Sequence, residues 1–362
     1  MRIHLKLKAA LRRCRRQTGA AAALLLALLT PAAAAGAESA AVILAYQRFG
    51  EGDISAASIR LDQFAEHLEI LTSGNYTVLP LPRVVEALQR GEALPDRTVA
   101  ITVDDAFLSV YREAWPRLKA ANLPWTLFVA PERVEGGYNR YMSLAQLREL
   151  QADPLVTIGA RGLSHTHLAS LPAESARRQV TAGADRLRAL LGERPRLFAY
   201  SYGEASLELM QEVEKAGFLA AFGQHSGAAT AAQNRWYLPR FPITEDYGDA
   251  ARFRRVADSQ GIPLTNWAPA DPALNVTAGD NPPAIGFNLP PELAALADSL
   301  ACYPSNGNLG QEIFRLGPDR LELRYARPFP PGRTRLNCTM PGDDGRWRWY
   351  GTQFYAFPPR GE

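Results

Sequence analysis

The stretch VAITVDDA, from Val99 to Ala106, predicts the fold class of this chain. It opens with apolar and β-branched residues, which is typical of a strand buried on both faces of a parallel sheet. The strand ends in two adjacent acids, Asp104 and Asp105. Parallel α/β proteins bind ligands at the carboxyl ends of their strands, where one acid could bind a cation while the other acts as a base. Capping of the following helix is the structural alternative for this pair.

Similar strand-like runs recur before and after this stretch. They are AVILAY (Ala41–Tyr46), WTLFVA (Trp125–Ala130), LVTIG (Leu155–Gly159) and LFAY (Leu197–Tyr200). Segments with helical spacing of apolar residues separate them, including a long one from 173 to 191. Repeated β–α units of this kind predict an α/β domain with a parallel sheet or barrel, which we place at residues 38–260.

Beyond residue 260 the pattern changes to short alternating runs separated by glycine and proline. These runs are LELRYA (321–326), TRLNCT (334–339) and WRWYGTQFYAF (347–357). Such alternation predicts antiparallel strands, so we expect a small all-β, sandwich-like domain over residues 261–362. Its aromatic residues could stack on sugar rings, but we favour the interpretation that they fill the β core: Trp347, Trp349, Tyr350, Phe354 and Tyr355.

The first 37 residues have the composition of a secretory signal peptide. They contain seven lysines and arginines and no acid, then an apolar run from Gly19 to Leu29, then small residues before Ala37. The apolar run is short for a membrane span, although an uncleaved anchor is an alternative. We therefore predict cleavage near Ala37, a periplasmic or secreted protein, and no stable membrane span after cleavage.

Loss of this segment would change two properties of the whole chain. The formal net charge falls from +3 to −4, which removes the case for binding to nucleic acid. Cys14 is lost as well, so Cys302 and Cys338 remain as an even pair in an oxidising compartment. We predict that these two form a disulfide, with two free buried thiols as the alternative.

Histidine is scarce, with five in the chain, and two of the five follow the predicted strand LVTIG. His165 would lie at the carboxyl end of that strand, on the same edge as Asp104 and Asp105, so it is a candidate metal ligand. His167 is two residues further on and is a weaker candidate, because its side chain can face elsewhere.

Three short motifs resemble those of the polysaccharide deacetylase family, the carbohydrate esterases with a NodB-homology domain. Thr102–Ala106 (TVDDA) is similar to the family's T-F-D-D-G, Arg161–His165 (RGLSH) to its H-[ST]-x-x-H, and Phe198–Gly203 (FAYSYG) to its F-A-Y-P-Y-G. Tyr46–Arg48 (YQR) is similar to a Y-H-R that often ends the first strand. The motifs occur in the family's order over about residues 40–245 and leave the C-terminal region uncovered.

The resemblance implies a distorted (β/α) barrel that removes N-acetyl groups from a polysaccharide. In the family a divalent metal, most often zinc, assists the attack of water on the acetamide carbonyl. Carried over to this sequence, Asp104 is the general base, Asp105 and His165 are metal ligands, and the backbone N–H of Tyr202 helps to hold the oxyanion. His167 is a further possible ligand.

The family's histidines are only partly present. Arg161 stands where the first histidine ligand is expected, and a guanidinium stays protonated and does not bind a metal. Gln47 replaces the histidine of the first strand. The family's late Leu-x-His motif has no counterpart, although His225 could replace its general acid.

Three functions are compatible with these departures. In the one we prefer, a metal still binds and the protein is a hydrolase that deacetylates an envelope or secreted polysaccharide. In the second, Arg161 supplies the positive charge beside Asp104 or Asp105, which gives a weak metal-free enzyme or a catalytically impaired, glycan-binding pseudoenzyme. In the third, the barrel is a scaffold in a cell-envelope assembly. The partner in the first two is an N-acetylated polysaccharide or oligosaccharide.

Overall fold

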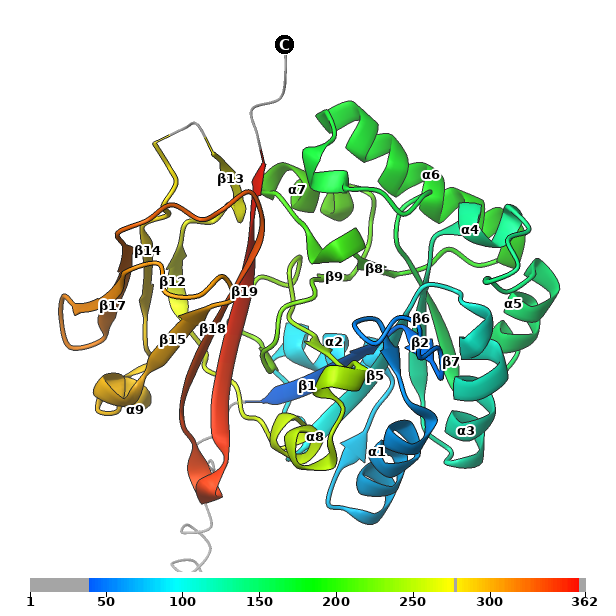
Figure 1. The fold of residues 1–362 in the computed structure, drawn as a ribbon, viewed down its shortest axis with the longest axis horizontal. Coiled ribbons are helices and arrows are strands. Elements are labelled where there is room, and N and C mark those ends of the chain that lie inside the picture. The colour runs from blue at the N-terminus through cyan, green and yellow to red at the C-terminus, as the bar shows by residue number, and fades with distance from the viewer. Residues whose placement is uncertain (1–38, 277–278, 358–362) are drawn as a thin grey trace, which may run out of the picture. The chain divides into compact units, whose positions relative to one another are not determined.

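A curled sheet of mainly parallel strands forms the centre of the α/β part, and β5 (Thr98–Asp104) is an inner strand of this sheet. β5 is parallel to its neighbours β1 (Ala40–Tyr46) and β6 (Trp125–Val129). The rest of the sheet comprises β7 (Val156–Ala160), β8 (Leu197–Ala199), β9 (Ala220–Phe222), β10 (Ala229–Thr230), β11 (Phe241–Pro242) and β4 (Thr77–Val78). The computed structural model describes residues 39–276 and 279–357. The curled half-barrel confirms the predicted barrel-like α/β fold (Figure 1).

Helices follow the strands in alternation and pack against the sheet, as Figure 1 shows. Their bounds are α1 (Leu61–Ser73), α2 (Leu81–Arg90), α3 (Trp115–Ala120), α4 (Pro131–Glu135), α5 (Leu144–Gln151), α6 (Ala173–Leu191), α7 (Leu207–Lys215) and α8 (Ala250–Ala257). Two short strands, β2 (Arg48–Phe49) and β3 (Ser58–Ile59), pair beside the end of β1. None of the helices in the described ranges is long and apolar enough to cross a membrane.

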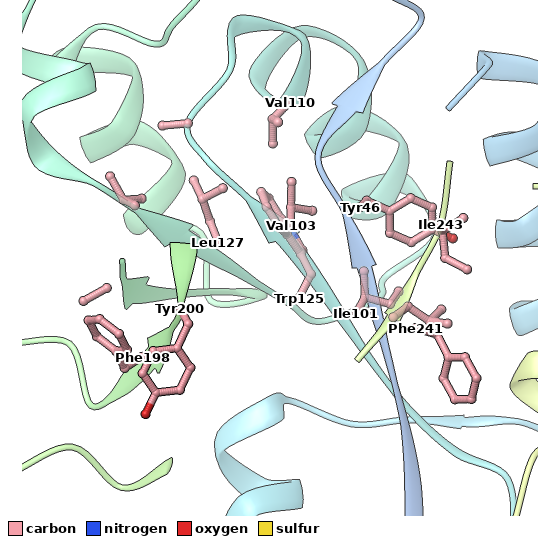
Figure 2. Close-up of a cluster of buried hydrophobic side chains, with 14 of the residues drawn as sticks. Tyr46, Ile101, Val103, Val110, Trp125, Leu127, Phe198, Tyr200, Phe241 and Ile243 are labelled. Carbon is pink, nitrogen blue, oxygen red and sulfur yellow. The ribbon is translucent and has the colours of Figure 1, made fainter. Parts of the chain in front are cut away.

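The barrel core is filled by side chains from neighbouring strands and from the segment after β11. Figure 2 shows this cluster, in which the labelled residues are Tyr46, Ile101, Val103, Val110, Trp125, Leu127, Phe198, Tyr200, Phe241 and Ile243. Alternate residues of β5, such as Ala100, belong to a second cluster on the other face of the sheet. Both faces of β5 are therefore buried, as its apolar sequence predicts, and the strand holds Asp104 rigidly at its end.

The C-terminal region consists of two sheets that share one core, and most of their strand pairs are antiparallel. One sheet contains β12 (Thr265–Ala268), β14 (Ile285–Asn288), β17 (Arg320–Tyr325) and β16 (Gln311–Arg315). The other contains β13 (Ala273–Asn275), β19 (Trp347–Phe357), β18 (Gly332–Pro341) and β15 (Ala301–Pro304), and a short helix α9 (Pro291–Ala294) precedes β15. The predicted alternating strands are confirmed as β17, β18 and β19.

The aromatic residues of β19 pack against two different cores. Tyr350 and Phe354 are buried in the β core, as expected. Trp349 and Tyr355 are only partly buried and pack against the barrel core instead. Gly351 lets β19 approach the barrel closely, because a Cβ at this position would lie 1.7 Å from the carbonyl oxygen of Ser226. The β region is therefore packed directly on the barrel, and this contact bears on the site described below.

Cys302 of β15 and Cys338 of β18 face each other across an antiparallel pair and form the predicted disulfide. Cys14 lies outside the described residues. Because 36 residues separate the two cysteines, the bond restricts a long segment of the unfolded chain.

We expect the double variant Cys302→Ser/Cys338→Ser to lose about 3–4 kcal/mol of unfolding free energy, as the chain-entropy argument predicts for this loop length. Urea denaturation followed by circular dichroism measures the loss. Thiol reductant should destabilise the unchanged protein and leave the double variant unaffected. Equal stability of the two proteins would contradict the prediction.

Candidate functional site

Asp104 and Asp105 lie at the carboxyl end of β5, and each is only 1% exposed. The backbone N–H of Asp105 donates to the carbonyl oxygen of Phe128 on β6, and Asp105 has a positive φ of 65°. This uncommon conformation separates the directions of the two side chains. The following helical segment begins at Leu108, and among the described residues no backbone N–H of that segment donates to either carboxylate. The helix-capping alternative for the two acids is therefore wrong.

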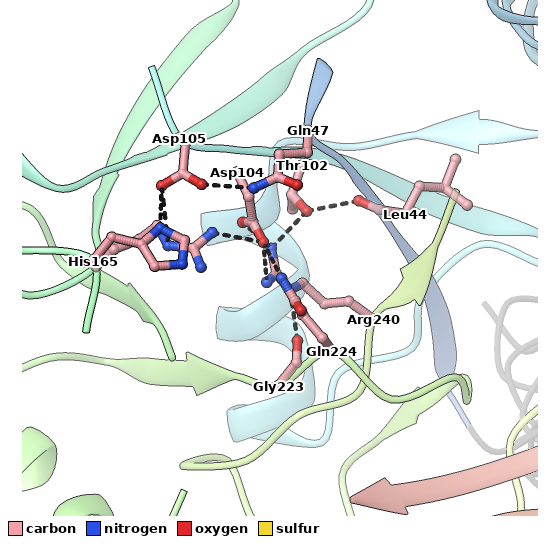
Figure 3. Close-up of polar contacts among 10 residues, drawn as sticks. Leu44, Gln47, Thr102, Asp104, Asp105, His165, Gly223, Gln224 and Arg240 are labelled. Carbon is pink, nitrogen blue, oxygen red and sulfur yellow. Dashed lines mark hydrogen bonds and ion pairs between the residues drawn. The ribbon is translucent and has the colours of Figure 1, made fainter. Parts of the chain in front are cut away.

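Asp104 is held by two arginines and a glutamine (Figure 3). Arg240 makes a two-pronged contact, with Nη1 2.7 Å from Oδ1 and Nη2 2.9 Å from Oδ2. Gln224 Nε2 donates to Oδ2 at 2.8 Å, and Arg161 Nη1 also lies 2.8 Å from Oδ2. Burial by itself would raise the pKa of Asp104, but the charges of Arg161 and Arg240 outweigh it and hold that pKa well below its usual range.

Arg240 is fully buried and is fixed by further bonds. Its Nε donates to the carbonyl oxygen of Gly223, and its Nη1 also donates to the hydroxyl of Thr102. Thr102 in turn donates to the carbonyl oxygen of Leu44 on β1. The sequence analysis missed both Arg240 and Gln224. A lone arginine between the apolar runs WYLP and FPI was the one available signal.

Asp105 contacts three further residues that the sequence analysis singled out, Gln47, His165 and Arg161. Gln47 Nε2 donates to Oδ2 at 2.8 Å, and His165 Nδ1 lies 3.2 Å from Oδ1. Arg161 Nε is 3.6 Å from the same Oδ1. Burial raises the pKa of Asp105, but Arg161 and His165 lower it by more, so this carboxylate stays ionised. The structure thus brings together Gln47, both acids, Arg161 and His165.

Arg161 directly follows β7 and lies between the two carboxylates. Burial lowers the pKa of its guanidinium, and the two acids raise it by more, so Arg161 stays charged. The contacts with the acids are ion pairs only: among the described residues, none of the three guanidinium nitrogens has a hydrogen-bond partner in good geometry. A buried guanidinium whose N–H groups lack well-aligned acceptors keeps unused capacity to donate hydrogen bonds.

The side chains do not fit the divalent metal that the resemblance implies. Metal binding would need a third ligand beside Asp105 and His165, and Arg161 stands there as a cation 3.6 Å from the Asp105 carboxylate. Within residues 39–276 and 279–357, no group of three His, Cys, Asp or Glu side chains is arranged to hold a metal ion. The predicted zinc site is not formed by these residues.

His167 does not join this cluster. Its Nδ1 lies 2.7 Å from Glu204 Oε2, and its ring stacks on Tyr202 with centroids 4.2 Å apart. The side chain is half exposed, whereas Glu204 is buried. The metal-ligand role that we predicted for His167 is therefore not supported, and its partner Glu204 was missed by the sequence analysis.

His225 is also directed away from the acids. Its ring packs against Tyr237 with centroids 4.6 Å apart and lines a cavity of about 60 Å³ together with Trp267 and Tyr350 of the β region. Burial and the charges of Arg335 and Arg240 lower the pKa of His225 to about 3. This placement gives no support to the general-acid role that the sequence analysis considered for His225.

Tyr202 lies in the short helical turn Ser201–Gly203 after β8, with a positive φ of 59°. Its ring meets His165 edge-on, with centroids 4.5 Å apart. The residue therefore lies beside the cluster, as the FAYSYG motif predicts. Its role in holding an oxyanion stays a prediction.

Comparisons with known proteins agree with this fold. Residues 91–221 match the model of the family described as polysaccharide deacetylase. The α/β part of this chain is thus similar to the polysaccharide deacetylase family over this range. The match leaves the β region outside its range.

Two curated relatives carry the same name, poly-β-1,6-N-acetyl-D-glucosamine N-deacetylase. The protein of Staphylococcus aureus (strain MRSA252) is 26% identical over 205 residues, which are 54% of this chain and 70% of the relative. The protein of Escherichia coli (strain K12) is 24% identical over 216 residues, which are 49% of this chain and 32% of the relative. The chain thus spans about a third of the longer relative. These similarities support a deacetylase-type protein at the level of the family.

Two solved structures share the deacetylase fold. IcaB from Ammonifex degensii aligns with a TM-score of 0.55 at 24% identity, over 61% of this chain and 98% of that one. The Streptococcus pyogenes deacetylase PplD in complex with acetate aligns with a TM-score of 0.54 at 21% identity, over 58% of this chain and 95% of that one. At these identities the likeness establishes the fold alone.

We expect the unchanged protein to retain no zinc after incubation and desalting, whereas Arg161→His should retain about one zinc per chain. The substitution removes the cation and adds an imidazole beside Asp105 and His165. Elemental analysis measures the bound metal. Arg161→Met is the matched control, because it removes the charge without adding a ligand. Equal metal content in Arg161→His and Arg161→Met would show that these side chains are not placed as the family's motif implies.

The low pKa of Asp104 predicts a pH dependence of stability. An unfolded aspartate titrates near pH 4, so the contribution of Asp104 to the free energy of unfolding is fully present above about pH 5 and is lost as the pH falls toward its lower folded pKa. Asp104→Asn should be less stable by about 3–5 kcal/mol at neutral pH, because two arginines lose their partner. Its stability should also change less between pH 5 and pH 2.5.

Urea unfolding across this pH range tests the prediction. Asp185→Asn is the control, because Asp185 is 58% exposed and makes only a long surface ion pair. A parallel pH dependence in Asp104→Asn and the unchanged protein would contradict the assignment of a low pKa to Asp104.

Proposed function

We propose that this protein binds an N-acetylated polysaccharide at the carboxyl edge of β5, β6 and β7 and does not hydrolyse it. The observation that carries this proposal is the contact of Arg161 with both acids, 2.8 Å from Asp104 and 3.6 Å from Asp105. Similarity to the polysaccharide deacetylase family over residues 91–221 supports the ligand class, and the composition of the first 37 residues supports action in the envelope or outside the cell.

Hydrolysis of an acetamide needs an activated water molecule. A metal supplies one by lowering the pKa of a water that it binds, and a guanidinium has no such open position. A general base works best when its pKa is near the working pH. The pKa of Asp104 lies well below its usual range, and four nitrogen atoms already contact its two oxygens. This arrangement disfavours proton transfer from water to Asp104.

Binding an acetamide, unlike hydrolysing it, requires no activated water molecule in the site. Its carbonyl oxygen is a neutral acceptor, and the N–H groups of Arg161 lack partners of good geometry among the described residues. Hydrogen bonds from a charged donor are stronger than neutral ones. Gln47, His165 and Tyr202 are partly exposed around the buried cluster, so a sugar can meet polar and aromatic groups at the same edge.

Slow, metal-free deacetylation is the second candidate. It is favoured by the convergence of Asp104, Asp105 and His165 on one edge and by the names of the relatives. In that case Arg161 would stabilise the negative charge on the carbonyl oxygen in the transition state. Metal-assisted hydrolysis, our preference from the sequence, has less support from the geometry because Arg161 stands in the ligand position.

A β-1,6-linked N-acetylglucosamine hexasaccharide tests both candidates, since the relatives are named for that polymer. We expect the unchanged full chain to bind it in calorimetry and to release no acetate detectable by NMR. Arg161→Met should bind about tenfold or more weakly, as loss of a charged hydrogen bond predicts. Arg178→Met, at a 60% exposed side chain of α6, is the control and should bind normally.

Either of two results would overturn the proposal. Acetate release by the unchanged protein that disappears in Asp104→Asn would favour the slow enzyme. Binding that is equal in Arg161→Met and the unchanged protein would remove Arg161 from the recognition of the ligand. Thermal melting of each variant confirms that it is folded before binding is compared.

A further inference from the structure

The β region holds the loop that carries Tyr202. Gln353 of β19 is fully buried, and its Nε2 donates to the carbonyl oxygens of Tyr202 at 3.2 Å and Gly203 at 2.9 Å. The hydroxyl of Tyr237 donates to the carbonyl oxygens of Gly203 and Gln353. A barrel loop at the candidate site is thus tied to a strand of the β region through buried hydrogen bonds.

The loop held in this way is strained. Tyr202 has φ 59° and ψ 8°, a left-handed conformation that costs a residue with a side chain free energy. Such conformations persist where surrounding contacts enforce them, and they cluster at ligand sites. In this protein the enforcing contacts come from Gln353, so the position of the Tyr202 ring depends on the β region.

Aromatic rings lead from the buried acids to β19. His165, which contacts Asp105, meets the ring of Tyr202 at 4.5 Å between centroids. Tyr202 stacks on His167 at 4.2 Å, with an angle of 12° between the planes. The ring of Tyr355 on β19 is parallel to that of His167, with centroids 6.3 Å apart. Each of these side chains is partly or largely exposed.

Charged groups border the same rings. Glu204 is buried beneath them, 2.7 Å from His167 and 3.7 Å from Arg333 of β18. The guanidinium of Arg333 also lies over the ring of Tyr202 at 5.7 Å, and its side chain is 42% exposed. These partly exposed aromatic side chains lie beside charged groups, a combination that suits a sugar ring, which has apolar C–H faces and a rim of hydroxyl groups.

We propose that Tyr202, His167 and Tyr355, together with Arg333, form a subsite for a further sugar ring of the N-acetylated polysaccharide. The subsite continues the edge at which Asp105 and His165 lie, so the ligand site is completed by β18 and β19. This inference rests on the proposed function, because it assumes that the barrel edge binds the same polysaccharide.

The test uses the full chain and the β-1,6-linked N-acetylglucosamine hexasaccharide, with affinity measured by calorimetry. Tyr355→Ala should weaken binding about fivefold to tenfold, the size expected from loss of an aromatic contact with its buried area. Tyr355→Phe keeps the ring and should bind as the unchanged protein does. Arg333→Gln should bind more weakly as well, and thermal melting checks that this variant is folded, because Arg333 also pairs with the buried Glu204.

Tyr303→Ala is the matched control. Tyr303 is a tyrosine of β15 in the same β region, it is 59% exposed, and it should make no difference to binding. An equal loss of affinity in Tyr303→Ala and Tyr355→Ala would show a general disturbance and overturn the subsite. If Tyr355→Ala lowers the melting temperature, the affinity of Arg333→Gln for the hexasaccharide tests the subsite instead.

The failure of the subsite is distinguishable from the failure of the proposed function. If the unchanged protein binds the hexasaccharide, and Tyr355→Ala and Arg333→Gln bind it equally well, the subsite is wrong and the proposed function stands. If the unchanged protein binds no hexasaccharide, the proposed function is wrong and the subsite is overturned with it.

Discussion

The buried cluster of Asp104, Asp105, Arg161 and Arg240 is the constraint on which the rest of the site depends. Two carboxylates and two guanidinium groups balance one another in charge, although all four residues are at most 1% exposed. Burying a charge is costly unless it is paired, and removing one partner leaves an uncompensated charge. The ends of β5 and β7 and the segment before β11 must therefore stay together.

The same cluster decides what chemistry the barrel edge can perform. A metal ion and a guanidinium both bring positive charge next to the acids, but only the metal can bind and ionise a water molecule. Arg161 can donate hydrogen bonds and nothing else, since its pKa is raised further by the acids. The fold is thus similar to that of the deacetylases, while a guanidinium occupies the position next to the two acids.

The sequence alone identified those site residues that directly follow a recognisable strand. The apolar run of β5 predicted both the strand and the location of Asp104 and Asp105, and the position of His165 after β7 placed it beside them. The pairing of Arg161 with the acids was one of the sequence hypotheses, because a cation in a ligand position needs a counter-charge. In each case the information lies within a few residues of a strand end.

Arg240 was missed for a physical reason. It lies 136 residues after Asp104, and nothing local distinguishes this arginine from the many exposed ones. The directions of His167 and His225 could not be predicted, because a strand end predicts where a backbone lies but not where a side chain points. His167, two residues after His165, contacts Glu204 instead of the acids. His225 faces the β region, although its neighbour Gln224 donates to Asp104.

The contact between the barrel and β19 could not be predicted from the sequence either. Through this contact the β region helps to position the Tyr202 loop. Gly351 allows the backbone of β19 to approach Ser226, and this approach brings Gln353 within reach of the Tyr202 loop. A strained loop needs such support, because its conformation is not the preferred one for tyrosine. The packing of the β region on the barrel is therefore one of the contacts that hold the Tyr202 loop at the barrel edge.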